Sequence, residues 1–176
     1  MSADQPQPPK PEAPSLNNGT QPPKAEIKII PAPSRPKITG MRTYFLAGTT
    51  TNPDWRQPLI TSLSSHPIAV FNPLRPDWDS SWLEDPSFPP FKEQVEWELE
   101  MQERAHVVVF YFGPHTDAPI SLLELGLCAP RKCVIVACHP DYKKRGNVLV
   151  LCQKYGHVVV DDVGQLADAV RGNFLG

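Results

Sequence analysis

The 176 residues carry 17 basic and 19 acidic side chains, which gives a formal net charge of −2. This near-neutral balance excludes general nucleic-acid binders and membrane-surface proteins, because both need a concentrated basic face. The longest apolar run, Val107 to Phe112, is far shorter than the roughly 20 residues that span a bilayer. The start of the chain holds no apolar signal segment, and the 4 cysteines form no CxxC pair. We therefore expect a reduced, cytoplasmic protein.

The amino-terminal part of the chain is rich in proline. Ten of the 22 prolines fall within residues 1–39, beside Gln, Lys, Ser and Asn. One short apolar cluster, at 27–30, buries too little surface to offset the entropy of ordering this stretch. We expect residues 1–39 to form a disordered tail that is solubilising or docks a proline-recognition module. The folded domain is expected over residues 40–176.

The domain alternates strands and helices. A short apolar strand at 43–47 precedes a helix at 53–64, and a second strand follows at 68–71. Prolines then predict a long irregular loop, which leads into a helix at 91–105 and a third strand at 107–112. A helix at 120–129 starts behind Pro119, and a fourth strand follows at 133–137. The last elements are a helix at 148–155, a strand at 158–160 and a helix at 164–171.

Continuous apolar strands separated by helices predict a parallel sheet that is covered on both faces. Five such strands fit one doubly wound α/β domain. In this architecture ligands bind at the carboxyl ends of the strands. Chemically active side chains are therefore expected in the loops after those ends and in the helices behind them.

Glu98 lies on the apolar side of the helix over 91–105. At about 100° per residue, one arc of that helix holds five side chains: Phe91, Val95, Leu99, Gln102 and Ala105. Glu98 projects from the middle of this arc, where a carboxyl is desolvated and its pKa rises unless it is paired. Glu98 is therefore either a functional acid or one half of a buried salt bridge to an arginine of the long loop.

Glu124 is the only charged residue of the helix over 120–129, which is apolar almost all round and is expected to be buried. It lies near the start of that helix, where a doubly wound sheet places its site. The helix dipole favours an ionised carboxylate there, and Ser121 can help to orient it. An ionised Glu124 beside a protonated Glu98 would suit cleavage of a glycosidic bond. A capping role for Glu124 is the alternative.

Five segments, in this order and spacing, resemble the nucleoside 2-deoxyribosyltransferase-like family: YFLAG at 44–48, NPLRPDWDSSW at 72–82, FKEQVEWEL at 91–99, PISLLELGL at 119–127 and RGNV at 145–148. The resemblance covers residues 40–160. It implies a flavodoxin-like fold and an enzyme that cleaves the N-glycosidic bond of nucleosides or nucleotides. The sugar would pass to another base or to water.

The resemblance also implies roles for three catalytic residues. It assigns the nucleophile to Glu124 and the acid to Glu98, which lies eight residues before His106. The family usually has Asp at this second position and Ala-Asp where this chain has Ala105-His106, so Glu98 is longer than the acid that the family usually carries. Tyr44 matches a strand tyrosine that lies beside the nucleophile in the transferases.

The other implied site residues contact the substrate: Gly48, Asn72, Asp77, Trp78, Asp79, Ser121 and Asn147. The loop residues Asn72 to Asp79 would recognise the base, and Asn147 would come from a neighbouring subunit of a homo-oligomer. Threonines 49–51 and Arg56 follow the first strand without the glycines and lysine of a phosphate loop, so nucleoside and nucleotide stay open. No histidine has ligand spacing, and we expect neither metal nor cofactor.

Two alternatives to a deoxyribosyltransferase or nucleoside or nucleotide hydrolase remain at this point. One is a non-catalytic nucleotide-binding or scaffold module of the same fold, with the tail recruiting partners. The other is an NAD glycohydrolase, which uses similar chemistry. The expected partner is a small nucleoside or nucleotide, with no nucleic-acid polymer and no membrane.

Overall fold

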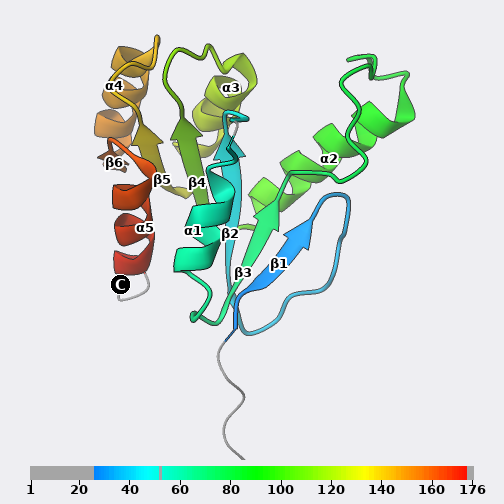
Figure 1. The fold of residues 1–176 in the computed structure, drawn as a ribbon, viewed down its shortest axis with the longest axis horizontal. Coiled ribbons are helices and arrows are strands. Elements are labelled where there is room, and N and C mark those ends of the chain that lie inside the picture. Colours follow the sequence, from blue (N-terminus) through cyan, green and yellow to red (C-terminus); the bar gives the residue numbers. More distant parts are fainter. Residues whose placement is uncertain (1–25, 52, 174–176) are drawn as a thin grey trace, which may run out of the picture.

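The structure, a computed structural model, describes residues 26–51 and 53–173. Within these residues, one parallel sheet of 6 strands carries helices on both faces (Figure 1). The strands are β1 (Lys28–Pro31), β2 (Arg42–Gly48), β3 (Ile68–Asn72), β4 (Val107–Phe112), β5 (Cys133–Cys138) and β6 (Val158–Val160). The helices are α1 (Arg56–Ser62), α2 (Pro89–Arg104), α3 (Pro119–Cys128), α4 (Arg145–Tyr155) and α5 (Val163–Gly172). The doubly wound α/β class predicted from the sequence is confirmed.

The strand order fixes where a ligand can bind. The order is β1-β3-β2-β4-β5-β6, and all neighbouring pairs are parallel. From β2 the chain first moves to β3 on one side and then to β4 on the other side. The direction therefore reverses between β2 and β4, and their carboxyl ends form the switch point at which such sheets bind ligands.

Strand β1 corrects the predicted domain boundary at residue 40. Lys28–Pro31 pairs in parallel with β3, and Ile30 and Ala32 are buried in the core. The chain then passes beneath α2, where the indole nitrogen of Trp97 donates a 2.8 Å hydrogen bond to the carbonyl of Ser34. These contacts order a short segment that propensity alone would leave irregular. Residues 1–25 of the predicted tail lie outside the described residues.

The sheet separates two apolar cores, because successive side chains of a strand point to opposite faces. Helices α2, α3 and α4 cover the face that carries Phe45, Phe71 and Phe110. Helices α1 and α5 cover the face that carries Tyr44 and Leu46. The face that carries Phe45 therefore brings α2 and α3 to the switch point, and α1 approaches it from the other face.

Two helices are less covered than their sequences predict. Helix α3 leaves Ile120, Leu123 and Leu127 exposed, although its sequence is apolar almost all round. Helix α2 buries Trp97 and Met101, whereas Val95 and Leu99, predicted to be buried, are exposed. Within the described part of the chain, no helix is both long and apolar enough to cross a membrane.

Gly48 ends β2 where the chain turns away from β4. Its φ is +125°, and a Cβ there would lie 2.2 Å from the carbonyl oxygen of Tyr111. Only glycine permits both this conformation and this close approach. The next residue, Thr49, joins the loops after β2 and β4, because its amide donates to the Tyr111 carbonyl and its hydroxyl accepts from the amide of Gly113. These hydrogen bonds fix the turn after β2, which lines a cavity at the carboxyl end of the sheet.

Candidate active site

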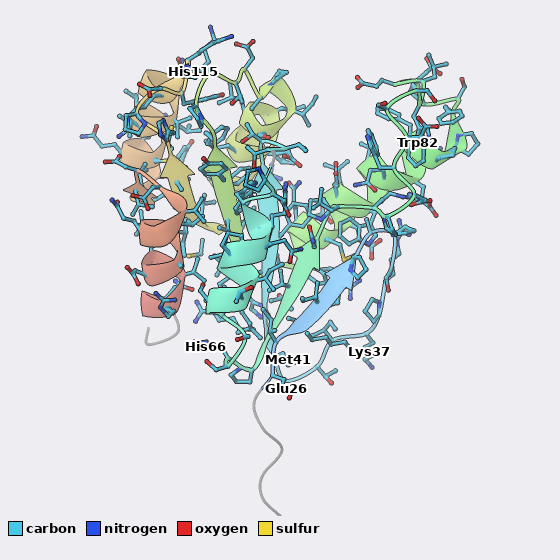
Figure 2. All side chains as sticks on the ribbon, viewed as in Figure 1. Glu26, Lys37, Met41, His66, Trp82 and His115 are labelled. Carbon is cyan, nitrogen blue, oxygen red and sulfur yellow. The ribbon has the colours of Figure 1, made fainter. Side chains whose placement is uncertain are left out.

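A cavity of about 690 Å³ lies at the switch point. Its walls come from the end of β2, the start of α1, the loop after β3, the middle of α2 and the first turns of α3. Figure 2 shows this edge of the sheet, with His115 labelled between β4 and α3 and Trp82 near the outer end of α2. The predicted site residues that line the cavity are Gly48, Trp78, Glu98, Ser121 and Glu124.

Glu98 projects into the cavity from the middle of α2. The side-chain amide of Gln94, one turn earlier, donates a 2.8 Å hydrogen bond to its Oε1. The same amide nitrogen donates to the carbonyl of Pro73 at 2.9 Å, so the carboxyl is held in one orientation. Burial raises the pKa of Glu98, and the Gln94 hydrogen bond and the positive charge of Arg56 oppose this rise.

Glu98 is not part of a buried salt bridge to the long loop. The pocket-lining arginine of that loop, Arg75, instead binds Asp77 at 2.9 Å and Glu93 at 2.8 Å. Among the described residues, no lysine or arginine forms an ion pair with Glu98. Its place on the buried side of α2 therefore favours the functional interpretation over the structural one.

Glu124 enters the same cavity from α3. Its Oε1 accepts a hydrogen bond from the side-chain amide of Gln102, whose oxygen in turn accepts from the thiol of Cys128 at 3.4 Å. Burial and the charge of Glu98 raise the pKa of Glu124 to about 7, against the opposing effects of Gln102 and Arg56. A pKa of about 7 leaves Glu124 partly ionised near neutral pH, whereas the sequence predicts a carboxylate that is ionised throughout.

Arg56 lines the cavity from the first turn of α1 and is only 2% exposed. Its guanidinium donates to Asp54 at 3.1 Å and to the carbonyls of Leu46 and Gly48, each at 3.4 Å. It also lies 4.7 Å from the centre of the Trp55 ring. A cation, two carboxyls and their amide partners thus meet at one edge of the sheet.

Aromatic side chains of the long loop form the outer wall. Trp78 lines the cavity and is half exposed, and its ring packs 4.9 Å from that of Trp82. The guanidinium of Arg75 lies over the Trp82 ring at 5.2 Å. The exposed indole of Trp78 therefore offers an apolar face to a planar ligand.

Tyr44 does not belong to this site. It is fully buried on the opposite face of the sheet, where its hydroxyl donates to Oδ1 of Asn173 at 3.3 Å. Its neighbour Phe45 faces the cavity instead. The catalytic role expected for Tyr44 is therefore wrong, because strand alternation turns it toward α1 and α5.

Three residues predicted to recognise the base have structural roles outside the cavity. Asn72 is buried and accepts a hydrogen bond from the amide of Leu74, which shapes the turn after β3. Asp77 is exposed and paired with Arg75. Asp79 is exposed and accepts a 2.8 Å hydrogen bond from the amide of Ser81. Short polar side chains in a proline-rich loop serve turns as readily as ligands.

Two further predicted residues have different positions. Ser121 lies in the cavity wall and is buried, but among the described residues it makes no hydrogen bond to Glu124, which Gln102 orients instead. Asn147 lies on the exposed first turn of α4, outside the cavity of its own chain. Its contribution to a neighbouring subunit stays a prediction.

The two amides that orient the carboxyls were not predicted from the sequence. Gln94 and Gln102 are both buried on α2 at helical spacing from Glu98. The available signal was the presence of uncharged amides on the helix side that also carries Trp97 and Met101. Within residues 26–51 and 53–173, no group of 3 His, Cys, Asp or Glu side chains converges as a metal site would require.

Comparison with known proteins bears on the fold and the family of this chain. A search of curated proteins gives no match. The crystal structure of a conserved protein from Enterococcus faecalis V583 superposes with a TM-score of 0.54 at 13% identity, over 76% of this chain and 99% of that one, which supports the fold. The model of the family described as "Nucleoside 2-deoxyribosyltransferase like" matches residues 42–142, the region that holds both glutamates and every wall of the cavity. The chain therefore belongs to the nucleoside 2-deoxyribosyltransferase-like family.

Proposed function

We propose that the protein cleaves the N-glycosidic bond of a nucleoside or nucleotide, with Glu124 as the nucleophile and Glu98 as the proton donor. The observation that carries this proposal is the convergence of these two carboxyls, from different helices, in one cavity at the switch point of the sheet. Membership of the family supports an enzyme of the glycosyl-transfer type. The geometry adds which side chains can do the chemistry.

The protonation states open to Glu98 and Glu124 suit general acid catalysis. Burial raises the pKa of both carboxyls, and the charge of Glu98 raises the pKa of Glu124 further. Two carboxyls that interact in this way titrate as a pair, so that one can hold a proton while the other is ionised. This state supplies one nucleophile and one acid, the combination that glycosidic cleavage needs.

The reaction follows from these positions. The ionised carboxylate of Glu124 attacks the anomeric carbon of the sugar, and a carbon–oxygen bond forms as the carbon–nitrogen bond breaks. The electron pair of the broken bond goes to the base nitrogen, while Glu98 gives its proton to the base. Glu98, now ionised, then takes a proton from water or from a second base. That acceptor attacks the sugar and releases Glu124.

The surroundings of the cavity support a planar leaving group. Trp78 lines the same cavity as Glu98, and its side chain is half exposed. Stacking against an indole is worth about 0.5–1.5 kcal/mol beyond burial of the same area. A base placed against Trp78 would lie on the Glu98 side of the cavity, with the sugar toward Glu124.

The test is chromatography of nucleosides, their 5′-monophosphates and NAD after incubation with the protein, with and without a second free base. The compared proteins are the wild type, Glu124→Gln, Glu98→Gln and the surface control Glu103→Gln. Base release that needs both pocket glutamates and persists in the control supports the proposal. Exchange with the added base identifies a transferase, and release without exchange identifies a hydrolase.

Two other results would overturn the proposal. If only NAD were consumed, the activity would be that of an NAD glycohydrolase. If the folded wild type turned over no substrate but bound nucleotides, and Glu124→Gln bound them equally well, the protein would be a binding module.

A further inference from the structure

Arg56 carries a buried positive charge at the floor of the cavity. Its side chain is 3% exposed, yet its only ion pair within the described residues is with Asp54, at 3.1 Å. Removing a guanidinium from water is costly unless its charge is compensated. The placement of this cation therefore needs a reason that packing does not provide.

The guanidinium is rigidly held. Two backbone carbonyls of the strand that ends at the cavity, Leu46 and Gly48, accept from Nε and Nη2, and Asp54 accepts from Nη1. The Trp55 ring lies 4.7 Å from the guanidinium carbon. Arginine has five N–H donors, and these contacts use three of them. A charge fixed in this way cannot turn to follow a ligand.

Arg56 acts on the glutamates without touching them. No oxygen of Glu98 or Glu124 lies within the 4.0 Å that defines an ion pair with it. Its charge nevertheless lowers the pKa of both carboxyls against the effect of burial. A direct ion pair would hold the nucleophile in place and weaken it, whereas a cation at a distance favours ionisation and leaves the carboxylate free to attack.

The other groups that face the pair cannot take over this role. Gln94 and Gln102 on α2 are uncharged, and burial raises the pKa of the Cys128 thiol on α3 to about 11, which keeps it neutral. The second pocket-lining arginine, Arg75, is bound to two carboxylates outside the cavity. Among the described residues, Arg56 is the arginine or lysine whose charge acts on both glutamates.

We infer that Arg56 is a positioning residue, a fixed positive charge that keeps one negative charge on the pair formed by Glu98 and Glu124. The catalytic meaning of this inference rests on the proposed function, because a shared proton matters only if the pair performs glycosidic chemistry. The effect of the Arg56 charge on the ionisation of Glu98 and Glu124 does not depend on turnover and can be tested on the folded protein.

The experiment is a pH titration of the full chain followed by carbon NMR of glutamate side chains labelled with ¹³C at the carboxyl. The signals of Glu98 and Glu124 are assigned by their loss in Glu98→Gln and Glu124→Gln. We expect Arg56→Met to move the midpoint of Glu124 upward by about one pH unit or more, since a nearby opposite charge shifts a carboxyl by about 1–3 units. Arg56→Lys, which keeps the positive charge, should leave the midpoint of Glu124 close to that of the wild type.

Two further variants separate charge from structure. Asp54→Asn removes the negative partner of Arg56 and keeps the cation, so the midpoint of Glu124 should move downward. Arg75→Met removes a pocket-lining arginine that is already paired, so the midpoint should change by less than about 0.3 units. If Arg56→Met does not fold, Asp54→Asn still decides the outcome through the sign of its shift.

Unchanged midpoints in folded Arg56→Met, or an upward shift in Asp54→Asn, would overturn the inference whatever the activity. Where the wild type is active, the acid limb of its kcat profile should move upward in Arg56→Met together with the NMR midpoint. If the NMR midpoints shift as expected but no substrate is turned over, the electrostatic role of Arg56 is supported and the proposed function is contradicted. The two failures are therefore distinguishable.

Discussion

Replacing Glu124 by glutamine should stabilise the protein at high pH. The folded pKa of Glu124 is about 7, raised from an ordinary value of 4.5. A carboxyl whose folded pKa is raised contributes stability that is fully present below about pH 4.5 and is lost as the pH rises through about 7. Glutamine does not titrate, and its side-chain oxygen can still accept the hydrogen bond from Gln102. The variant therefore avoids the cost of burying a charge.

The size of the effect follows from the shift. A displacement of about 2.5 units corresponds to about 3 kcal/mol at 1.36 kcal/mol per unit. Between pH 5 and pH 8 the free energy of unfolding of Glu124→Gln, relative to the wild type, should therefore rise by about 2–3 kcal/mol. At a slope of about 1–3 kcal/mol per molar urea, this raises the urea midpoint by about 1 M or more.

Urea unfolding followed at several pH values between 5 and 8.5 measures this difference directly. Glu103→Gln, on the exposed side of the same helix that carries Glu98, controls for the loss of one negative charge. Its stability should follow that of the wild type within about 0.5 kcal/mol at every pH. A constant difference between Glu124→Gln and the wild type over this range would refute the reasoning, because it would mean that Glu124 titrates alike in the folded and unfolded chain.

Three other variants test separate parts of the structure. Tyr44→Phe should retain full activity in a base-release assay and lose about 0.5–1.5 kcal/mol of stability in urea, because its hydroxyl donates to Asn173 on the face of the sheet away from the cavity. A chain that begins at residue 40 should be at least about 3 kcal/mol less stable than one that begins at residue 26, since it loses β1 and leaves the Trp97 indole without its acceptor; equal thermal midpoints would show that β1 is dispensable. Trp78→Ala should raise KM about 2- to 12-fold with little change in kcat if its ring stacks on the base, and an unchanged KM would remove it from the binding site.

The sequence predicted the sheet because buried parallel strands have a strong signature. The central strands are short runs such as Val107 to Phe112, and all six residues of that run are buried. The predicted boundaries therefore differ from the observed ones by only a few residues. Strand β1 was missed because Lys28–Pro31 is short and lies beside prolines, and only its pairing with β3 and the burial of Ile30 order it.

The two glutamates could be predicted for different reasons. Glu98 falls within both the expected apolar arc and the observed buried side of α2, although the latter is displaced toward Trp97 and Met101. Glu124 is the single charge of an apolar helix at the right topological position. Tyr44 was assigned by resemblance, and alternation along β2 already places it opposite Phe45.

The electrostatic balance of the site was beyond the sequence. Whether Glu124 is ionised depends on how far burial and the charge of Glu98 outweigh the effects of Gln102 and Arg56. The distances between these groups exist only in three dimensions. Three elements, β3, α2 and β4, separate the helix of Arg56 from the helix of Glu124 along the chain. Their shared cavity is a consequence of the reversal in strand order.

The added strand β1 also determines how the protein can be attached to something else. Residue 26 enters the domain at the amino ends of the strands, and Figure 2 shows Glu26 at the edge opposite His115. The cavity opens at the carboxyl ends, on the His115 side. A surface, carrier or fused protein that holds the chain ahead of residue 26 would thus leave the mouth of the cavity facing solution, and immobilised protein should accept substrate as readily as free protein.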